Sequence, residues 1–402
     1  MIVLHPPIIR SATVWLFLVF PLFLSGQSAA PNILCSAGDR NFDAEFRNGV
    51  KVHVGAARNG GLALRACAAN LGWEKQELLV AEGASQIDLD AFGVDLGDGI
   101  PAAAFQIKKS DASCCMDYAI YSLQKPPRLL RNITGGEFFT ASDMDLDGSV
   151  EIWTDDAAAV DGFENLTLGE LDSAPTVIFR FARGQLRDVS AEFQPYFDNQ
   201  IGDVHSQIHA RDLEDFKNSD GRLTAPTSAE LRHRLRTVKV KVLEIVWAYL
   251  YSGRESEAWR SLNEMWPPSD VERIRAGLLK TRELGIHREA DETSSGPSSR
   301  KKKHAQVFDA FTESGPENKL EVVPPEAILL QRPSLSEQTQ SESELLLELV
   351  VDEAGKVRSA KLIGGSSDRE LIRAALTWKF IPAFKDDRAV ASRLRIAVSP
   401  KQ

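Results

Sequence analysis

Apolar and polar residues follow their most regular pattern between Glu344 and Val398. Leu345 to Val351 form an apolar run that predicts a strand. The next five residues, Asp352 to Lys356, predict a turn, because Gly355 adopts a positive φ at little cost. Val357 to Ile363 alternate between apolar and polar side chains, which predicts a second, half-buried strand.

A helix and a last strand are predicted to follow. Asp368 is a candidate helix N-cap, and apolar residues recur after it at helical spacing as far as Trp378. Pro382 ends the helix, and Ala389 to Val398 alternate as the last strand. The pattern therefore predicts a β-β-α-β unit in which a helix covers one face of a small sheet.

The region from residue 31 to 222 has a different pattern, with short apolar runs separated by Gly, Asp and Asn turns. Repeated short strands of this kind are typical of a sandwich, a barrel or a propeller-like array. A weak internal repeat favours the last option, because Asp95–Ala102 resembles Asp145–Glu151 at a distance of roughly 50 residues, about one propeller blade. Only two copies can be argued, so we expect a partial array or a sandwich.

The remaining segments complete the predicted division of the chain. Helical periodicity predicts a hairpin or small bundle over residues 226–287, and a polar stretch rich in Ser and charge predicts a disordered linker over 288–321. The last predicted domain spans 322–402. The expected fold class is multidomain α+β, with a β-rich first domain, a helical segment and the small β-β-α-β domain at the end.

Residues 1–30 have the features of a targeting segment. Arg10 precedes an apolar run from Val14 to Leu24, and small residues follow from Ser25 to Ala30. The run is short for a membrane span, which needs roughly 20 residues. We expect a cleaved signal peptide, with a short retained anchor as the alternative. The predicted location is the periplasm or the exterior, or the inner membrane if the anchor is retained.

Export makes the four cysteines candidates for two disulfides, because an oxidising compartment allows them to form. Cys35 and Cys67 can pair with each other while Cys114 pairs with Cys115, or the pairs can cross. We expect crossed pairing, since a bond between adjacent cysteines is strained.

The composition of the 402-residue chain is ordinary for a globular protein, but its net charge of −10 argues against a general nucleic-acid surface. The sequence contains no Gly-x-Ser-x-Gly, no His-Glu-x-x-His and no Gly-x-x-x-x-Gly-Lys motif. We therefore predict a protein that is not an enzyme.

The sharpest chemistry lies in the second copy of the repeat, between Ser142 and Trp153. Three aspartates at alternate positions, followed by a glycine, let one tight loop aim several oxygens at a point, and calcium requires roughly six to eight hard oxygen ligands. An EF-hand would need a Glu at the twelfth position, where Thr154 stands. The alternative to a metal site is an acidic turn whose aspartates accept hydrogen bonds from backbone amides.

This run, DMDLDGSVEIW, resembles the loop of FG-GAP or VCBS repeats. The resemblance implies a calcium ion with Asp143, Asp145 and Asp147 as ligands, and with the Ser149 carbonyl and Glu151 as further ligands. The first copy has fewer acids, so we expect it to be empty.

A second resemblance covers about the last fifth of the chain. The run WKFIPAFKDDRAV, with Trp378, Phe380, Pro382 and Ala383 in order, resembles the C-terminal domain of the TonB energy transducers. In that family partners add a strand to a sheet edge, so the resemblance implies docking on an exposed last strand, Ala389–Val398. Arg393, Arg395, Trp378 and Phe380 are the candidate partner-binding residues. The alternative role of the two arginines is to protect an edge from aggregation.

These features lead to one expected function and two alternatives. We expect a non-enzymatic binding or adaptor protein of the bacterial cell envelope, with a calcium-stabilised β domain and a partner in the envelope. The first alternative is an energy transducer coupled to an outer-membrane receptor, with membrane contact through a retained anchor. The second is a secreted hydrolase, which would have a deep acidic pocket lined by paired carboxylates.

Overall fold

A computed structural model describes residues 33–59, 62–110, 114–182, 184–224, 228–293, 305–311, 322–331, 345–363 and 368–398. All of these belong to one compact unit of the chain. The predicted signal segment, residues 1–30, lies outside the described residues. The domain boundaries proposed from the sequence stay predictions.

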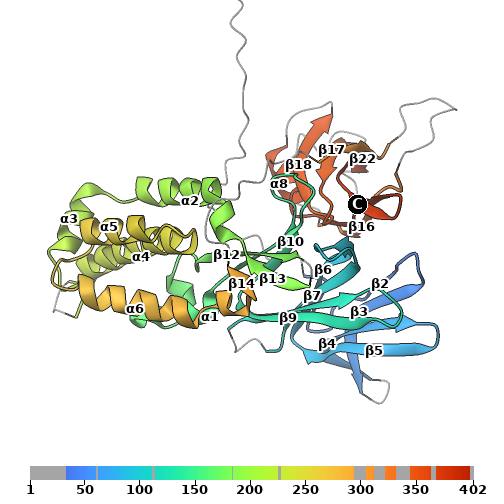
Figure 1. The fold of residues 1–402 in the computed structure, drawn as a ribbon, viewed down its shortest axis with the longest axis horizontal. Coiled ribbons are helices and arrows are strands. Elements are labelled where there is room, and N and C mark those ends of the chain that lie inside the picture. The colour runs from blue at the N-terminus through green and yellow to red at the C-terminus, as the bar shows by residue number, and fades with distance from the viewer. Residues whose placement is uncertain are drawn as a thin grey trace, which may run out of the picture. The chain divides into compact units, whose positions relative to one another are not determined.

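Three successive four-stranded antiparallel meanders form the first half of the unit (Figure 1). The first contains β2 (Phe42–Glu45), β3 (Val50–Asn59), β4 (Leu62–Trp73) and β5 (Gln76–Ala84). The second contains β6 (Gln86–Asp95), β7 (Pro101–Lys108), β8 (Met116–Ser122) and β9 (Arg128–Gly136), with β1 (Cys35–Ser36) at the β6 edge. The third contains β10 (Phe139–Ser142), β11 (Glu151–Asp155), β12 (Thr176–Ala182) and β13 (Gln185–Asp188), with β14 (Glu292–Thr293) parallel to β13.

The two copies of the internal repeat occupy equivalent loops, between β6 and β7 and between β10 and β11. In the first loop the Asp95 carboxylate accepts hydrogen bonds from the backbone N–H groups of Gly97 and Gly99 at 2.8 and 2.9 Å. Asp143 accepts two such bonds in the second loop. In two consecutive meanders, the loop that connects the first two strands therefore contains an aspartate that accepts two backbone N–H groups.

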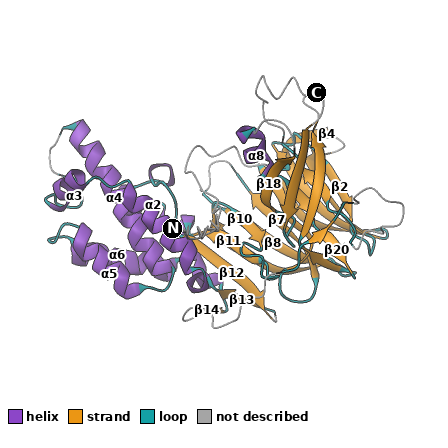
Figure 2. Ribbon diagram, turned by 90° about the horizontal axis from the view of Figure 1, so that it is seen from above, coloured by secondary structure: helices purple, strands orange, loops and turns teal. Residues whose placement is uncertain are grey.

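Helices follow the third meander and gather beside it (Figure 2). The helices are α1 (Ala157–Val160), α2 (Gln194–Ser206), α3 (Ala210–Lys217), α4 (Ala229–Tyr251), α5 (Glu255–Met265) and α6 (Val271–Leu284). Short 3-10 turns are η1 (Phe163–Asn165), η2 (Leu168–Glu170), η3 (Ser190–Glu192) and η4 (Ile286–Glu289). Ser228 caps α4 by accepting a hydrogen bond from the N–H of Leu231. Trp247 and its α4 neighbours share one hydrophobic core with β10–β13.

The C-terminal part contains β15 (Phe308–Asp309), β16 (Glu326–Leu329), β17 (Leu345–Val351), β18 (Val357–Ile363), α8 (Arg369–Ala375), β19 (Lys379–Ile381), β20 (Ala383–Lys385), β21 (Arg388–Val390) and β22 (Ser392–Val398). The main sheet has the strand order β15-β22-β17-β18. Two small sheets pair β16 with β19 and β20 with β21. Asp368 caps α8, as its sequence position predicts.

The predicted fold class is wrong. Several separate antiparallel sheets dominate the protein, with 40% strand and 30% helix, and the described residues form no closed barrel or propeller. Three consecutive meander sheets, two with five strands and one with four, are too few for a ring, since a propeller takes roughly four or more blades. The terminal module is not a simple β-β-α-β unit either. β15 adds a parallel strand to its sheet, and β19, β20 and β21 form between the helix and the last strand and pair in other sheets.

The C-terminal part contacts the first two meanders, and two buried ion pairs connect it to β6 of the second. Lys379 pairs with Asp88 and Lys356 with Asp90, both aspartates lying on β6. Phe384 joins the hydrophobic core of the first two meanders, with its ring centroid 6.2 Å from that of Phe46. The meanders and the C-terminal part are therefore packed against each other through buried side chains.

The cysteines form the two local pairs rather than the crossed ones. A disulfide joins Cys35 to Cys67, both fully buried, and ties β1 to β4. A second bond joins Cys114 to Cys115. The expected crossed pairing is wrong, because β1 lies beside β6 and brings Cys35 into the core next to β4.

Within the described part of the chain, no helix has both the length and the apolar character needed to cross a membrane.

Candidate functional site

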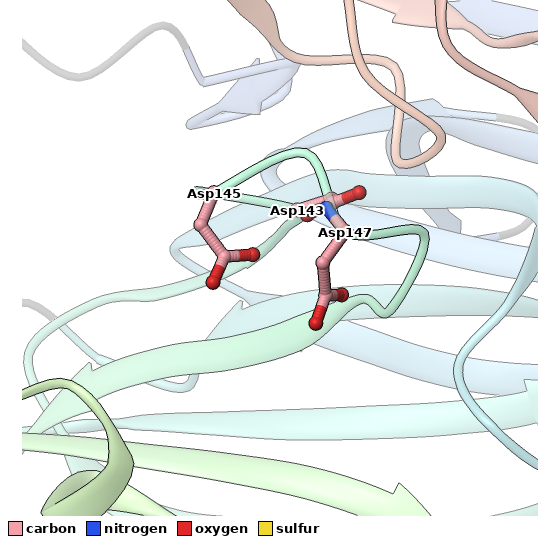
Figure 3. A group of neighbouring side chains, drawn as sticks. All are labelled: Asp143, Asp145 and Asp147. Atoms are coloured by element: carbon pink, nitrogen blue, oxygen red, sulfur yellow. Dashed lines mark hydrogen bonds between the residues drawn. The ribbon is translucent and has the colours of Figure 1, made fainter. Parts of the chain in front are cut away.

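The candidate metal site is the loop between β10 and β11. Asp143 is fully buried, and its two carboxylate oxygens accept hydrogen bonds from the N–H groups of Asp147 at 3.0 Å and Gly148 at 2.8 Å. The chain turns through Leu146 at φ 52° and Gly148 at φ 85°, the left-handed region that favours glycine. The Asp145 and Asp147 side chains point in the same direction from the loop, and the Asp143 carboxylate lies against the backbone of the turn (Figure 3).

Asp143, Asp145 and Asp147 each offer one carboxylate oxygen, and these three atoms lie within 4.8 Å of one another. Calcium binds oxygens at roughly 2.3–2.6 Å, so oxygens around one ion are separated by about 5 Å or less. The observed spacing is therefore compatible with a calcium ion. A purely structural turn explains the hydrogen bonds that Asp143 and Asp147 accept from backbone N–H groups.

Glu151 begins β11 and is fully buried. Its Oε1 atom accepts two hydrogen bonds from the Arg180 guanidinium, at 2.7 and 2.9 Å. Among the described residues, no donor reaches its Oε2 atom. Burial raises the pKa of Glu151 to about 8, Arg180 opposes that rise, and the charges of Asp145 and Asp143 add to it. The side chain thus carries one unsatisfied oxygen and interacts electrostatically with Asp145 and Asp143, but it is not part of the group of three oxygens within 4.8 Å. Ser149, the other predicted ligand, lies in the same turn and donates its N–H to Asp147 at 2.8 Å.

The turn between β17 and β18, far away in the sequence, lies against this loop. Asp352 is fully buried, and its Oδ2 accepts hydrogen bonds from the Ser142 hydroxyl at 2.9 Å and the Asp143 N–H at 3.1 Å. Its Oδ1 accepts the N–H groups of Ala354 and Lys356 within its own turn. One carboxylate therefore holds both the turn and the loop.

Glu353 extends the acidic cluster beyond the residues predicted from the sequence. Its side chain is 8% exposed and shares a hydrogen bond with the carboxyl group of Asp143. A hydrogen bond between two carboxyl groups needs a proton on one of them. Burial and the contact with Asp143 raise the pKa of Glu353 to about 8, while burial raises the pKa of Asp143. The sequence predicts Asp352 and Glu353 only as turn residues, because the residues next to them in the chain do not indicate that they contact the β10–β11 loop.

The predicted partner-binding residues are all engaged within the protein. Trp378 and Phe380 are each 2% exposed, and the Trp378 indole N–H donates to the carbonyl of Gln331 at 2.7 Å. Arg393 pairs with Asp309 at 3.0 Å, and Arg395 pairs with Glu348 at 3.2 Å. These four side chains stabilise the C-terminal module in the structure.

The last strand is also paired on both sides. β22 is antiparallel to β17 along its whole length, and β15 pairs with it in parallel at Ser392 and Arg393. The predicted strand Ala389–Val398 is broken at Ala391, with β21 before the break and β22 after it. The expectation that this strand offers a free border for a partner is therefore wrong at Ser392 and Arg393.

A shallow hollow of about 430 Å³ lies elsewhere, between β5 and strands β7 to β9. Its lining includes Val80, Ile107 and Leu129, together with an ion pair of 2.7 Å between Lys109 and Asp117. A second acid, Glu82, also lines the hollow, so its lining holds two carboxyl groups, of which that of Asp117 is paired with Lys109.

Comparisons with known proteins add no relatives. No family model matches the chain, and no curated protein and no solved structure matches it. The resemblances to FG-GAP or VCBS loops and to TonB C-terminal domains therefore rest on the quoted residues alone.

Proposed function

We propose that this chain is an exported, non-catalytic calcium-binding protein of the bacterial cell envelope, which acts as a binding scaffold for another envelope protein. The observation that carries the proposal is the convergence of the Asp143, Asp145 and Asp147 carboxylates within 4.8 Å. The donor set supports calcium in particular, because it consists of hard oxygens with neither histidine nor thiolate among them.

Export is supported by the disulfide between Cys35 and Cys67. Disulfides persist in oxidising compartments and are rare in the bacterial cytosol. An extracellular or periplasmic position also suits a calcium site, since sites of extracellular modules work at roughly 0.1–1 mM calcium. The role of the ion in this proposal is structural: it holds the acidic β10–β11 loop together where the β17–β18 turn packs against it.

Calorimetric titration of the mature protein with calcium tests the proposal. Asp145→Asn is the informative variant, because it removes a charged candidate ligand and leaves Asp143, which also accepts hydrogen bonds from two backbone N–H groups, in place. We expect wild-type protein to bind one calcium ion, and the variant to bind at least about tenfold more weakly, since one of a small set of ligands is lost.

Asp95→Asn is the matched control, because Asp95 opens the equivalent loop between β6 and β7 and accepts similar backbone bonds. It should bind calcium as the wild type does. Equal binding by the wild type and Asp145→Asn, or no saturable binding by the wild type, contradicts the proposal. A parallel titration with magnesium shows whether the site prefers the larger ion.

A further inference from the structure

We propose that the candidate cation is shared between the β10–β11 loop and the β17–β18 turn, with Glu353 as a ligand, so that calcium locks the C-terminal module onto the meanders. This inference rests on the proposed function and deepens it. It assigns the ion a ligand that lies about 200 residues away in the sequence, on a different sheet.

The first support is the set of direct contacts between turn and loop. Asp352 accepts hydrogen bonds from Ser142 and Asp143, as described above. Arg358, on β18, donates to the Ser142 hydroxyl at 3.1 Å and to the Met144 carbonyl at 3.5 Å. Each of these contacts fixes the position of the turn relative to the aspartate loop. Glu353 is thereby held with its carboxyl group against that of Asp143.

The second support is the state of the buried oxygens. Among the described residues, Oε2 of Glu353 and Oε2 of Glu151 have no hydrogen-bond partner. The two side chains are 8% and 0% exposed, so water does not solvate them freely. An unsatisfied buried carboxylate oxygen carries the full penalty of desolvation. A cation placed between the turn and the loop would satisfy oxygens from both elements at once.

The third support is the local charge. Six carboxyl groups gather here, those of Asp143, Asp145, Asp147, Glu151, Asp352 and Glu353. Arg180 pairs with Glu151, and Arg358 donates to the Ser142 hydroxyl and the Met144 carbonyl beside the group. Lys356 is directed elsewhere, to Asp90 on β6. The charges of Asp143 and Asp145 disfavour the ionised form of Glu151, and a divalent ion among these carboxyl groups would reduce that repulsion.

The consequence is thermodynamic coupling. If the ion binds oxygens on both elements, binding favours the docked turn, and the docked turn raises the affinity for the ion by the same factor. The Ala354 side chain is buried in the core that contains β10–β12, so the turn also packs against the meanders in the absence of the ion. Calcium is thus expected to tighten a contact that already exists.

The test combines calcium titration with hydrogen exchange of the mature full-length protein. In wild-type protein we expect calcium to slow amide exchange in the turn by at least about tenfold, since the N–H groups of Ala354 and Lys356 bond to Asp352 beside the site. In Glu353→Gln we expect calcium affinity to fall at least about tenfold and the effect of calcium on the turn to be lost. The amide of Gln can still donate to Asp143, which preserves the fold without calcium.

Glu370→Gln is the matched control, since Glu370 is an exposed acid of the same module that pairs with Arg373 on its own helix. It should behave as the wild type does. The coupling is overturned if the wild type binds calcium and Glu353→Gln binds it with the same affinity. It is also overturned if calcium binding leaves amide exchange in the turn unchanged. Either result is compatible with the calcium site itself. No calcium binding by the wild type overturns both. Circular dichroism confirms that each variant is folded.

Discussion

The Nζ atom of Lys356 lies 2.6 Å from Oδ1 of Asp90 and joins the β17–β18 turn to strand β6. Asp90 is 2% exposed, and its Oδ2 accepts hydrogen bonds from the Tyr118 hydroxyl and the Ala141 N–H, both at 2.7 Å. This carboxylate therefore connects the second meander, the third meander and the C-terminal module.

Lys356→Met should destabilise the protein by about 3–5 kcal/mol, because it leaves the buried charge of Asp90 without its cation. Lys361→Met, on the exposed side of β18, is the control and should change stability by less than about 0.5 kcal/mol. Urea unfolding measures both. A loss of less than about 1 kcal/mol in Lys356→Met would show that the pair does not hold the module in place.

Gly355→Ala tests the close contact of the same turn with β19. An added Cβ at Gly355, where φ is +80°, would lie 1.9 Å from the Phe380 carbonyl oxygen. At Gly99, φ is +71° and nothing lies within 4 Å of the added atom. Gly99→Ala should therefore cost about 1 kcal/mol through its backbone alone, and Gly355→Ala about 1–3 kcal/mol more. Equal losses in chemical unfolding would rule out the contact.

Replacing both Cys35 and Cys67 by Ala should lower the free energy of unfolding by about 2–4 kcal/mol, because the bond closes a long loop. The matched variant replaces Cys114 and Cys115, which are adjacent in the chain and so close no loop. Its loss should be smaller, below about 1 kcal/mol. The comparison uses denaturant midpoints, and a larger loss in the second variant would contradict the expected order.

The buried carboxyl of Glu244 makes stability depend on pH. Glu244 lies on α4, is 5% exposed, and accepts a hydrogen bond from Ser173 at 3.1 Å. Burial, with a contribution from Asp172, raises its pKa from 4.5 to about 7. Between these two values the folded protein binds a proton that the unfolded chain releases. The contribution of Glu244 to stability is therefore fully present below about pH 4.5 and is lost as the pH rises through about 7.

Glu244→Gln removes this dependence. Relative to the wild type, it should gain up to about 3 kcal/mol in stability between pH 4.5 and pH 8. Glu230→Gln, at the exposed start of the same helix, should leave the slope unchanged. Unfolding curves at four or five pH values measure the slopes, and parallel curves for Glu244→Gln and wild type would refute the assignment.

Local sequence signals predicted the parts of the fold that local physics determines. Strands β17 and β18, the turn at Gly355 and the cap at Asp368 lie where alternation, positive φ and capping chemistry place them. The aspartate loop was also recognisable, because its three carboxylates and its glycine all lie between Asp143 and Gly148.

Contacts between distant residues left no such signal. β15 is two residues long, and its pairing with β22 depends on a partner more than 80 residues away. The contact of Asp352 and Glu353 with the loop spans about 200 residues, so a single sequence identifies them only as turn formers. The fold class was wrong for the same reason: local patterns predict strands, but the order of strands in sheets depends on long-range packing.

The most direct test of the central claim is a crystal structure of the mature protein grown with calcium and measured for anomalous scattering. We predict a calcium peak about 2.3–2.6 Å from carboxylate oxygens of Asp143, Asp145 and Asp147. An ordered loop in the presence of millimolar calcium, with no peak among these carboxylates, would contradict the account.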